Sequence, residues 1–258
     1  MRNFSLFLIA SLFAFSCGES KHEASKTSDL LADNLSGKVE QAVQTSYKAD
    51  STGKAGEQDS CCVITNSYDE KGYSSAYASV NKAGTDKEET TFSHDDNELF
   101  TGQKTSKNGK PIGMLAVENV DGKPHVARSF DSANKMDFYF TDITMNEYNR
   151  LLGYKQFKPD SSLKTSTEVT YDKQFYKGQI TKDSVGKEVY SSTVKLDDKN
   201  NMIESTTKEV TKDSTINKTS KYHYDSFDDH GNWTQRTESD EKGKPVTIAK
   251  RTITYYKE

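Results

Sequence analysis

Hydrophobic residues are scarce in this sequence. They make up 32% of the 258 residues, whereas globular domains usually contain roughly 45–50%. This shortage excludes a deep globular core. Lysine, aspartate, glutamate, serine and threonine dominate instead, and 14 tyrosines supply much of the apolar surface. Such a composition suits a thin buried layer with most side chains in water, as in an extended sheet.

Cysteine and proline are also rare. Besides Cys17, the only cysteines are the neighbours Cys61 and Cys62, so the chain has no disulfide framework. On a strand these two side chains point to opposite faces. We expect one packed inward and one exposed, with a strained vicinal disulfide or an intermolecular bridge as the alternative. The prolines stand at turns or at the first position of predicted strands, where a missing N–H breaks no ladder: Pro111, Pro124, Pro159 and Pro245.

The chain lacks the signals of several function classes. Its formal net charge is −4 with both signs interspersed, and the absence of a basic stripe argues against nucleic acid as a partner. The glycines are scattered rather than clustered before a helix, and no Gly-x-Ser-x-Gly elbow occurs. Nucleotide binding and nucleophilic catalysis are therefore not supported. The sequence indicates no cofactor.

Only one long hydrophobic run occurs, at the N-terminus. Residues 4–15 are almost purely apolar, follow Arg2 and precede Ser16-Cys17-Gly18, which is the arrangement of a signal peptide with a lipidation site. About a dozen residues are too few to cross a hydrocarbon core that needs roughly 20, so we expect no transmembrane helix after processing. Ala14-Phe15 departs from the common lipobox, which leaves ordinary signal cleavage as the alternative.

From these features we predict three parts. Residues 1–16 form a lipoprotein signal peptide, residues 17–34 comprise the lipidated Cys17 and a flexible tether rich in Ser, Lys and Glu, and residues 35–258 form one β-repeat domain. A diacylated cysteine gives lasting attachment to a membrane. The expected location is the cell envelope, anchored by lipid in the outer membrane, on its periplasmic or its outer side.

Turn signals rich in Asp, Asn and Gly recur about every 26 residues, with a second series midway. The segments between them are rich in β-formers and alternate, as where Tyr190, Val194 and Leu196 share a face. This predicts an all-β fold, a sequential antiparallel meander of repeated hairpins with about 16 strands, the first at residues 39–48. We favour a curved or twisted extended sheet because apolar residues are few, with an open barrel as the alternative. Residues 146–152 resemble a helical turn, but the repeat phase makes them a turn followed by a strand.

An aromatic-Asp-x-x-Gly pattern marks the first and last repeats. It occurs as Tyr68-Asp69-Glu70-Lys71-Gly72 and as Tyr224-Asp225 leading to Asp229-His230-Gly231-Asn232-Trp233, and it resembles the YD repeats of bacterial surface proteins. Residues 35–39 and 231–256 look like uncharacterised repeat lipoproteins of Gram-negative bacteria. The likeness covers residues 35–258, although Val120-Asp121 and Met145-Asn146 replace the Tyr-Asp pair in the middle. The resemblance implies a scaffold and carries over no catalytic residue.

The richest polar cluster spans residues 223–232, with three carboxylates and two histidines. Its spacing matches neither an EF-hand loop nor a His-x-x-x-His helix, so we interpret it as a long turn rather than a calcium or zinc site. The acid pairs Asp95-Asp96, Asp197-Asp198 and Asp228-Asp229 are compatible with a hydrolase, but predicted turns keep carboxylates solvated. We therefore predict that the chain is not an enzyme, and an envelope hydrolase ranks third.

Two binding functions rank above the hydrolase. The first is a non-enzymatic envelope lipoprotein that serves as a scaffold or binding module for protein or glycan. Aromatic rings that could stack on its ligand are Trp233, Tyr222, Tyr224 and Tyr255. For Trp233 we favour packing on Tyr255 or Tyr256 over display at a sheet edge. The second function is a carrier of a lipid or other apolar ligand, which requires a gap beside a concave patch formed by Val39, Val43, Phe138, Phe140, Val194 and Ile248.

Overall fold

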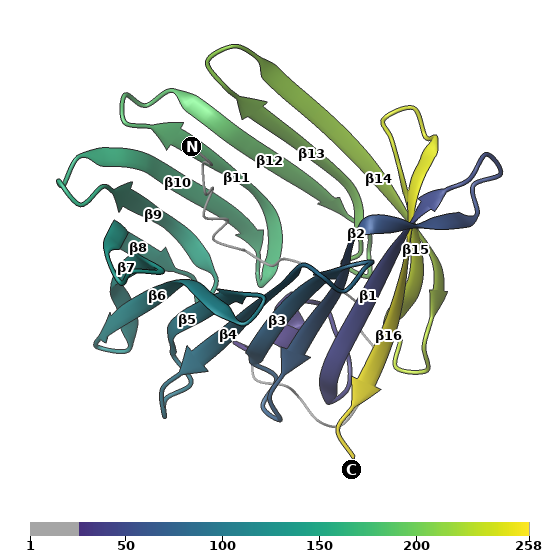
Figure 1. Ribbon diagram of the computed structural model, residues 1–258, viewed down its shortest axis with the longest axis horizontal. Coiled ribbons are helices and arrows are strands. Elements are labelled where there is room, and N and C mark those ends of the chain that lie inside the picture. Colours follow the sequence, from purple (N-terminus) through teal and green to yellow (C-terminus); the bar gives the residue numbers. More distant parts are fainter. Residues whose placement is uncertain (1–25, 258) are drawn as a thin grey trace.

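The fold is built almost entirely of β-strands. A computed structural model describes residues 26–257 and contains sixteen strands and one short helix (Figure 1). The helix is α1 (Asp29–Ala32), and the strands are β1 (Val39–Ala49), β2 (Ala55–Tyr68), β3 (Ser74–Asn81), β4 (Lys87–His94), β5 (Phe100–Lys107), β6 (Lys110–Val120), β7 (Lys123–Asp131), β8 (Met136–Met145), β9 (Leu151–Phe157), β10 (Leu163–Asp172), β11 (Phe175–Asp183), β12 (Glu188–Leu196), β13 (Met202–Val210), β14 (Thr215–Phe227), β15 (Trp233–Ser239) and β16 (Pro245–Tyr255). Within the described residues, no helix has the length and apolar character that a membrane crossing needs.

The strands follow one another around a closed barrel. Each pairs antiparallel with the next along the chain, and β1 also pairs with β16. The closing register runs from Val39 opposite Tyr255 to Lys48 opposite Thr247. The all-β antiparallel meander is therefore confirmed, and the barrel alternative describes its shape better than the elongated sheet that we favoured. Residues 146–150 form a turn before β9, as the repeat phase predicts.

One turn design joins most of the strands. In nine turns of residues 26–257, an Asp or Asn side chain accepts the backbone N–H groups two and four residues further along. The capping residues are Asp50, Asp69, Asp95, Asp131, Asn146, Asp183, Asp197, Asp228 and Asp240. The third residue after each cap has a positive φ, which Gly and Asn adopt most easily. This geometry explains the repeated turn signals in the sequence.

The inside of the barrel is only partly apolar. Among residues 26–257, most of the buried hydrophobic residues fall into three separate clusters rather than one core. The sheet also holds partly buried polar pairs, such as Thr90 with Thr105 and Thr167 with Thr181, whose hydroxyl oxygens are 3.1 and 3.0 Å apart. Partly buried hydroxyls that hydrogen-bond to each other need no apolar neighbours. This is why few hydrophobic residues suffice to close the barrel.

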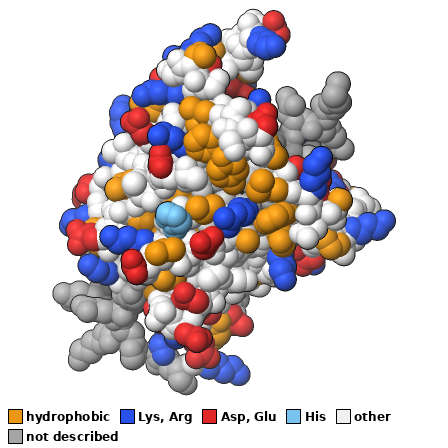
Figure 2. Space-filling model, turned by 90° about the vertical axis from the view of Figure 1, so that its left-hand side faces the viewer, with side chains coloured by type: hydrophobic (Ala, Val, Ile, Leu, Met, Phe, Trp, Pro, Cys, Tyr) orange, Lys and Arg blue, Asp and Glu red, His pale blue; other side chains and the backbone are white. Residues whose placement is uncertain are grey.

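The outer face carries charges of both signs. Lys195 Nζ lies 2.6 Å from Glu204 Oε1, and Lys182 Nζ lies 3.5 Å from Glu168 Oε1, on the side of the sheet opposite the buried Ser192. Exposed pairs of this kind add little stability. On the side at the left of Figure 1, hydrophobic side chains gather in the middle and charged side chains surround them (Figure 2).

Residues 26–34, which we assigned to a flexible tether over residues 17–34, pack on the barrel in the structure. We call residues 26–35 the N-terminal segment. Ser28 caps α1, because its hydroxyl oxygen accepts the backbone N–H of Leu30 at 3.2 Å. Ser28 is fully buried and Leu30 is 4% exposed. Residues 1–25, with the predicted signal peptide and Cys17, lie outside the described part of the chain.

Apolar contacts explain why this segment docks. Leu30 and Leu35 form a hydrophobic cluster with Val39 and Tyr68, and the backbone N–H of Leu30 donates to Gly72 O at 3.1 Å. The apolar residues of a four-residue helix are too few to show a periodic pattern in the sequence. They are nevertheless enough to bury the segment once a sheet is present for them to pack on.

Candidate functional site

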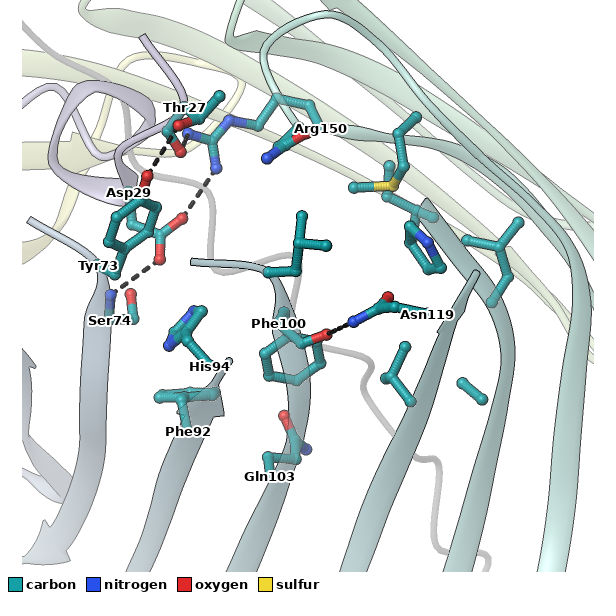
Figure 3. A pocket seen from close by; sticks show the side chains of 18 of the residues that line it. Thr27, Asp29, Tyr73, Ser74, Phe92, His94, Phe100, Gln103, Asn119 and Arg150 are labelled. Carbon is teal, nitrogen blue, oxygen red and sulfur yellow. Dashed lines mark hydrogen bonds and ion pairs between the residues drawn. The ribbon is translucent and has the colours of Figure 1, made fainter. Parts of the chain in front are cut away.

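A cavity of about 310 Å³ lies inside the barrel, between the N-terminal segment and the wall formed by β4–β9 (Figure 3). Its volume falls at the lower end of the roughly 300–1,000 Å³ typical of small-molecule pockets. The wall is mostly apolar and is built by Phe92, Phe100, Leu115, Val117, Ala127, Phe140, Ile143 and Tyr154. All but Phe92 belong to one hydrophobic cluster. The cavity therefore has a continuous apolar wall.

The two-residue period of the strands places these side chains inside. In β6, Leu115 and Val117 line the cavity, whereas Ala116 and Glu118 are exposed. The strand register then puts Val117 opposite Ala127 of β7, which is 6% exposed. Side chains that lie opposite each other on neighbouring strands contact on one face of the sheet. Successive hairpins thus extend the apolar wall around the barrel.

Arg150 binds the N-terminal segment at one end of the cavity, which the segment covers (Figure 3). Its Nη1 lies 2.9 Å from Asp29 Oδ1, and its Nη2 donates to the carbonyl oxygens of Thr27 and Ser28 at 3.0 and 2.6 Å. The second carboxylate oxygen of Asp29 accepts the backbone N–H of Ser74 at 2.8 Å. Arg150 is 8% exposed. Charge-assisted bonds are roughly twice as strong as neutral ones, so the segment is held firmly at this end.

Further polar groups surround the same end. Tyr73 Oη donates to Glu98 Oε2 at 2.9 Å, and Lys71 Nζ lies 2.8 Å from Glu98 Oε1. The hydrogen bonds from Lys71 and Tyr73 lower the pKa of Glu98. The His94 imidazole lies beside the rings of Tyr73 and Phe100, with centroids 5.4 and 5.9 Å apart. The cavity is therefore polar at the end that the N-terminal segment covers and apolar along its wall.

The tyrosines of the wall act as neutral groups. Burial raises the pKa of Tyr154, and it raises the pKa of Tyr171 to about 12. Both phenols therefore stay protonated at neutral pH. Among residues 26–257, no three His, Cys, Asp or Glu side chains are placed together to hold a metal ion. The arrangement is suited to holding an apolar molecule with a polar end.

The aromatic residues that we expected to stack on a ligand lie away from this cavity. Trp233 is 1% exposed, so its ring is packed within the chain rather than displayed to a ligand. It packs on Tyr224, with ring centroids 6.1 Å apart, and the Arg251 guanidinium lies 3.9 Å from its centroid. Tyr224 Oη donates to Met202 O at 3.1 Å. The ring therefore packs inside the barrel, but not on Tyr255 or Tyr256 as we expected.

The other two aromatic candidates also have partners within the chain. The Tyr222 ring lies 5.0 Å from the Arg236 guanidinium carbon. Tyr255 stacks on His230 with centroids 4.1 Å apart, and its hydroxyl donates to Asp228. Burial raises the pKa of Tyr255. Tyr224 and Trp233 are thus brought together, whereas Tyr255 lies in a separate contact.

A concave apolar patch exists, but most of its residues are not those that we expected. Of the six residues proposed for a carrier, only Phe140 lines the cavity. Phe138 packs against the same cluster, whereas Val39 belongs to the cluster of the N-terminal segment. The six residues therefore do not form one patch. Strand register decides which apolar residues meet, and the sequence shows no signal for that register.

The polar cluster at residues 223–232 contains the turn that we expected. Asp228 Oδ1 accepts the backbone N–H groups of His230 and Asn232 at 3.0 and 2.9 Å. Asp95 and Asp197, the first members of the other acid pairs, cap turns in the same way. These three carboxylates accept hydrogen bonds from the backbone of their own turns, and none of them lines the cavity.

The two cysteines of β2 are unpaired. Cys61 is exposed and Cys62 is partly buried, as expected for neighbours on a strand. Burial raises the pKa of Cys62 to about 11, with a smaller contribution from Cys61. The thiol of Cys62 is therefore a weak nucleophile at neutral pH, because the thiolate is the reactive form.

No family model matches the chain, and no curated protein matches it. Among solved structures, a porin-like protein from Bacteroides uniformis has a TM-score of 0.52 and 13% identity, covering 84% of this chain and 96% of that chain. A porin-like protein from Bacteroides vulgatus has a TM-score of 0.33 and 12% identity, covering 84% and 98%. A putative outer membrane lipoprotein-sorting protein domain from Vibrio parahaemolyticus has a TM-score of 0.26 and 7% identity, covering 84% and 86%. The first likeness shows a shared fold alone.

Proposed function

We propose that this chain is a non-enzymatic lipoprotein of the cell envelope that binds an apolar small molecule inside its barrel. The observation that carries the proposal is the cavity of about 310 Å³ with an apolar wall from β4–β9. A ligand of this kind gains free energy when its hydrocarbon surface leaves water. This is the carrier function of the sequence analysis, and the cavity favours it over a scaffold for protein or glycan.

The N-terminal segment supports binding inside the barrel. Its residues Thr27, Asp29 and Ala32 line the cavity, and Arg150 holds the segment in place through Asp29. A pocket with a covered end shields more of a ligand from water than an open groove does. The segment therefore contributes to the binding site directly.

The outer face favours a water-exposed barrel over a membrane pore. The ion pairs of Lys195 with Glu204 and of Lys182 with Glu168 lie on outward-facing strand positions. Transmembrane barrels present an apolar band at such positions, where charged residues cost about 2–4 kcal/mol at the bilayer centre. In our proposal, attachment to the outer membrane comes from lipid on Cys17, and the barrel itself stays in water.

A matched pair of substitutions tests ligand binding. Ala127→Phe fills the cavity from its wall, whereas Ala116→Phe adds the same group on the exposed face of β6. The purified mature chain is titrated with the uncharged fluorescent probe N-phenyl-1-naphthylamine, and apolar molecules that co-purify are extracted and identified by mass spectrometry. We expect Ala127→Phe to lower probe affinity at least tenfold and Ala116→Phe to leave it unchanged.

Two results would contradict the proposal. Absence of probe binding by the wild-type chain, or equal affinities of both variants and the wild type, would show that the cavity holds no ligand. Circular dichroism of each variant checks that the barrel is intact, because overpacking a filled core distorts it.

A further inference from the structure

Two polar atoms in the lining of the cavity lack partners. Arg150 Nε and Asn119 Oδ1 are both buried and have no hydrogen-bond partner among residues 26–257, and both residues line the cavity. They lie on different sides of it (Figure 3). The rest of each side chain is engaged, since Asn119 Nδ2 donates to Phe100 O at 3.1 Å. Buried polar atoms without partners are costly, so the cavity is complementary to polar groups of a ligand.

The two atoms call for opposite partners. Arg150 Nε–H is a donor and needs an oxygen to accept from it, whereas Asn119 Oδ1 is an acceptor and needs an O–H or N–H group. A hydroxyl group can do either. A head group with at least two hydroxyls can therefore offer a suitable partner to each atom.

The carboxylates at the covered end of the cavity already have partners within the chain. Asp29 lies 2.9 Å from Arg150, and Glu98 lies 2.8 Å from Lys71. Asp33, which also lines the cavity, accepts the Tyr68 hydroxyl at 2.6 Å. An anionic head group would enter beside three carboxylates, and like charges repel strongly in a poorly hydrated site. The electrostatics therefore disfavour fatty acid and phosphate head groups.

We propose, building on the proposed function, that the ligand is an uncharged single-chain amphiphile with a polyhydroxyl head group, bound with its chain along the β4–β9 wall and its hydroxyls at Arg150 Nε and Asn119 Oδ1. The chain of such a ligand matches the apolar wall, and its head matches one donor and one acceptor. The N-terminal segment covers the head through Thr27 and Asp29.

Three ligands with the same sixteen-carbon acyl chain test this specificity: 1-monopalmitoylglycerol, methyl palmitate and palmitate. Each is titrated against the wild-type chain loaded with N-phenyl-1-naphthylamine. Methyl palmitate only accepts hydrogen bonds, and palmitate carries a charge. We expect 1-monopalmitoylglycerol to displace the probe at about tenfold lower concentration than either, which corresponds to one well-made buried hydrogen bond.

Variants assign the preference to the two atoms. Asn119→Ala removes the acceptor, and we expect it to reduce the affinity for 1-monopalmitoylglycerol to that for methyl palmitate while leaving methyl palmitate unaffected. Asn217→Ala, at an exposed position of β14, is the control and keeps the preference. Arg150→Lys retains the charge opposite Asp29 but removes Nε–H, and we expect it to reduce the same preference.

The outcomes separate this proposal from the function on which it rests. If the probe binds and all three ligands displace it equally, or palmitate binds most tightly, the cavity is a binding site but its polar end does not select hydroxyls. A uniform loss of all three ligands in Asn119→Ala also overturns the assignment. If neither the probe nor any ligand binds to the wild-type chain, the proposed function itself falls.

Discussion

Replacing Gly72 with alanine should release the N-terminal segment from the barrel. Gly72 has a φ of +89°, and a Cβ at this position would lie 2.6 Å from Ser28 Oγ and 2.9 Å from Leu30 Cδ1. Gly186 occupies the same position of its own turn, three residues after the capping Asp183, with a φ of +84° and no atom within 4 Å of its Cβ position. The two substitutions therefore share the backbone strain and differ only in the contact with the N-terminal segment.

The structure gives the size of each effect. A left-handed conformation costs alanine roughly 1–2 kcal/mol, which is all that Gly186→Ala should lose. Gly72→Ala adds an overlap with a buried segment, and overpacking costs typically 1–3 kcal/mol. We expect Gly72→Ala to lower the free energy of unfolding by about 3 kcal/mol and Gly186→Ala by about 1 kcal/mol. For a chain of this size, the difference of about 2 kcal/mol corresponds to a gap in Tm of roughly 4–8 °C.

Urea unfolding and hydrogen exchange measure the two consequences separately. The midpoints give the free energies, and amide exchange of Leu30 and Leu35 reports on docking of the N-terminal segment. We expect these amides to exchange faster in Gly72→Ala than in Gly186→Ala, because only Gly72 contacts the segment. Equal losses of stability with equal exchange would refute the reasoning, since they would show that the contact at Gly72 contributes nothing.

Three further predictions concern other parts of the chain. Cys17→Ser should move the protein from the membrane to the soluble fraction and abolish labelling by radioactive palmitate; retained label contradicts it. Asp197→Ala removes the acceptor of Lys199 N–H and Asn201 N–H and should cost about 1–2 kcal/mol in urea unfolding, whereas an unchanged midpoint contradicts a capping role. Because burial raises the pKa of Tyr171 from 10.0 to about 12, stability should fall as pH rises through that window. In Tyr171→Phe, the free energy of unfolding should decrease less over this pH range. An equally steep decrease in the variant would contradict the role of Tyr171.

The repeated turns could be predicted from the sequence because each is specified locally. Asp69 and Gly72 stand three residues apart, and the turn needs nothing beyond an acceptor at the first position and a positive φ at the second. Even the turn capped by Asp95, where Glu98 takes the positive φ of 66°, keeps the same cap. Strand order follows from the turns, because a short turn forces the next strand to lie antiparallel beside the last.

Closure of the barrel and the cavity depend on contacts between distant residues. The seam pairs Val39 with Tyr255, and neither strand contains a local signal for the other. The low number of hydrophobic residues led us to favour an extended sheet over a barrel. Hydrogen-bonded hydroxyl pairs, such as Thr167 with Thr181, replace part of the apolar interior that a barrel was expected to need. The cavity wall could not be predicted either, since its residues come from six strands whose registers place them on a common face.

The N-terminal segment links the two features of the proposed function, which are the lipid on Cys17 and the cavity. Cys17 precedes Lys26 by nine residues, which span at most about 30 Å when fully extended. Lys26 Nζ lies 3.5 Å from Glu147 Oε2, in the turn that leads to Arg150. A lipid on Cys17 therefore keeps the covered end of the cavity within about 30 Å of the membrane. Under the proposed function, an amphiphile that leaves the bilayer would have only a short path through water to this end, and the segment that covers the cavity would also connect it to the lipid anchor.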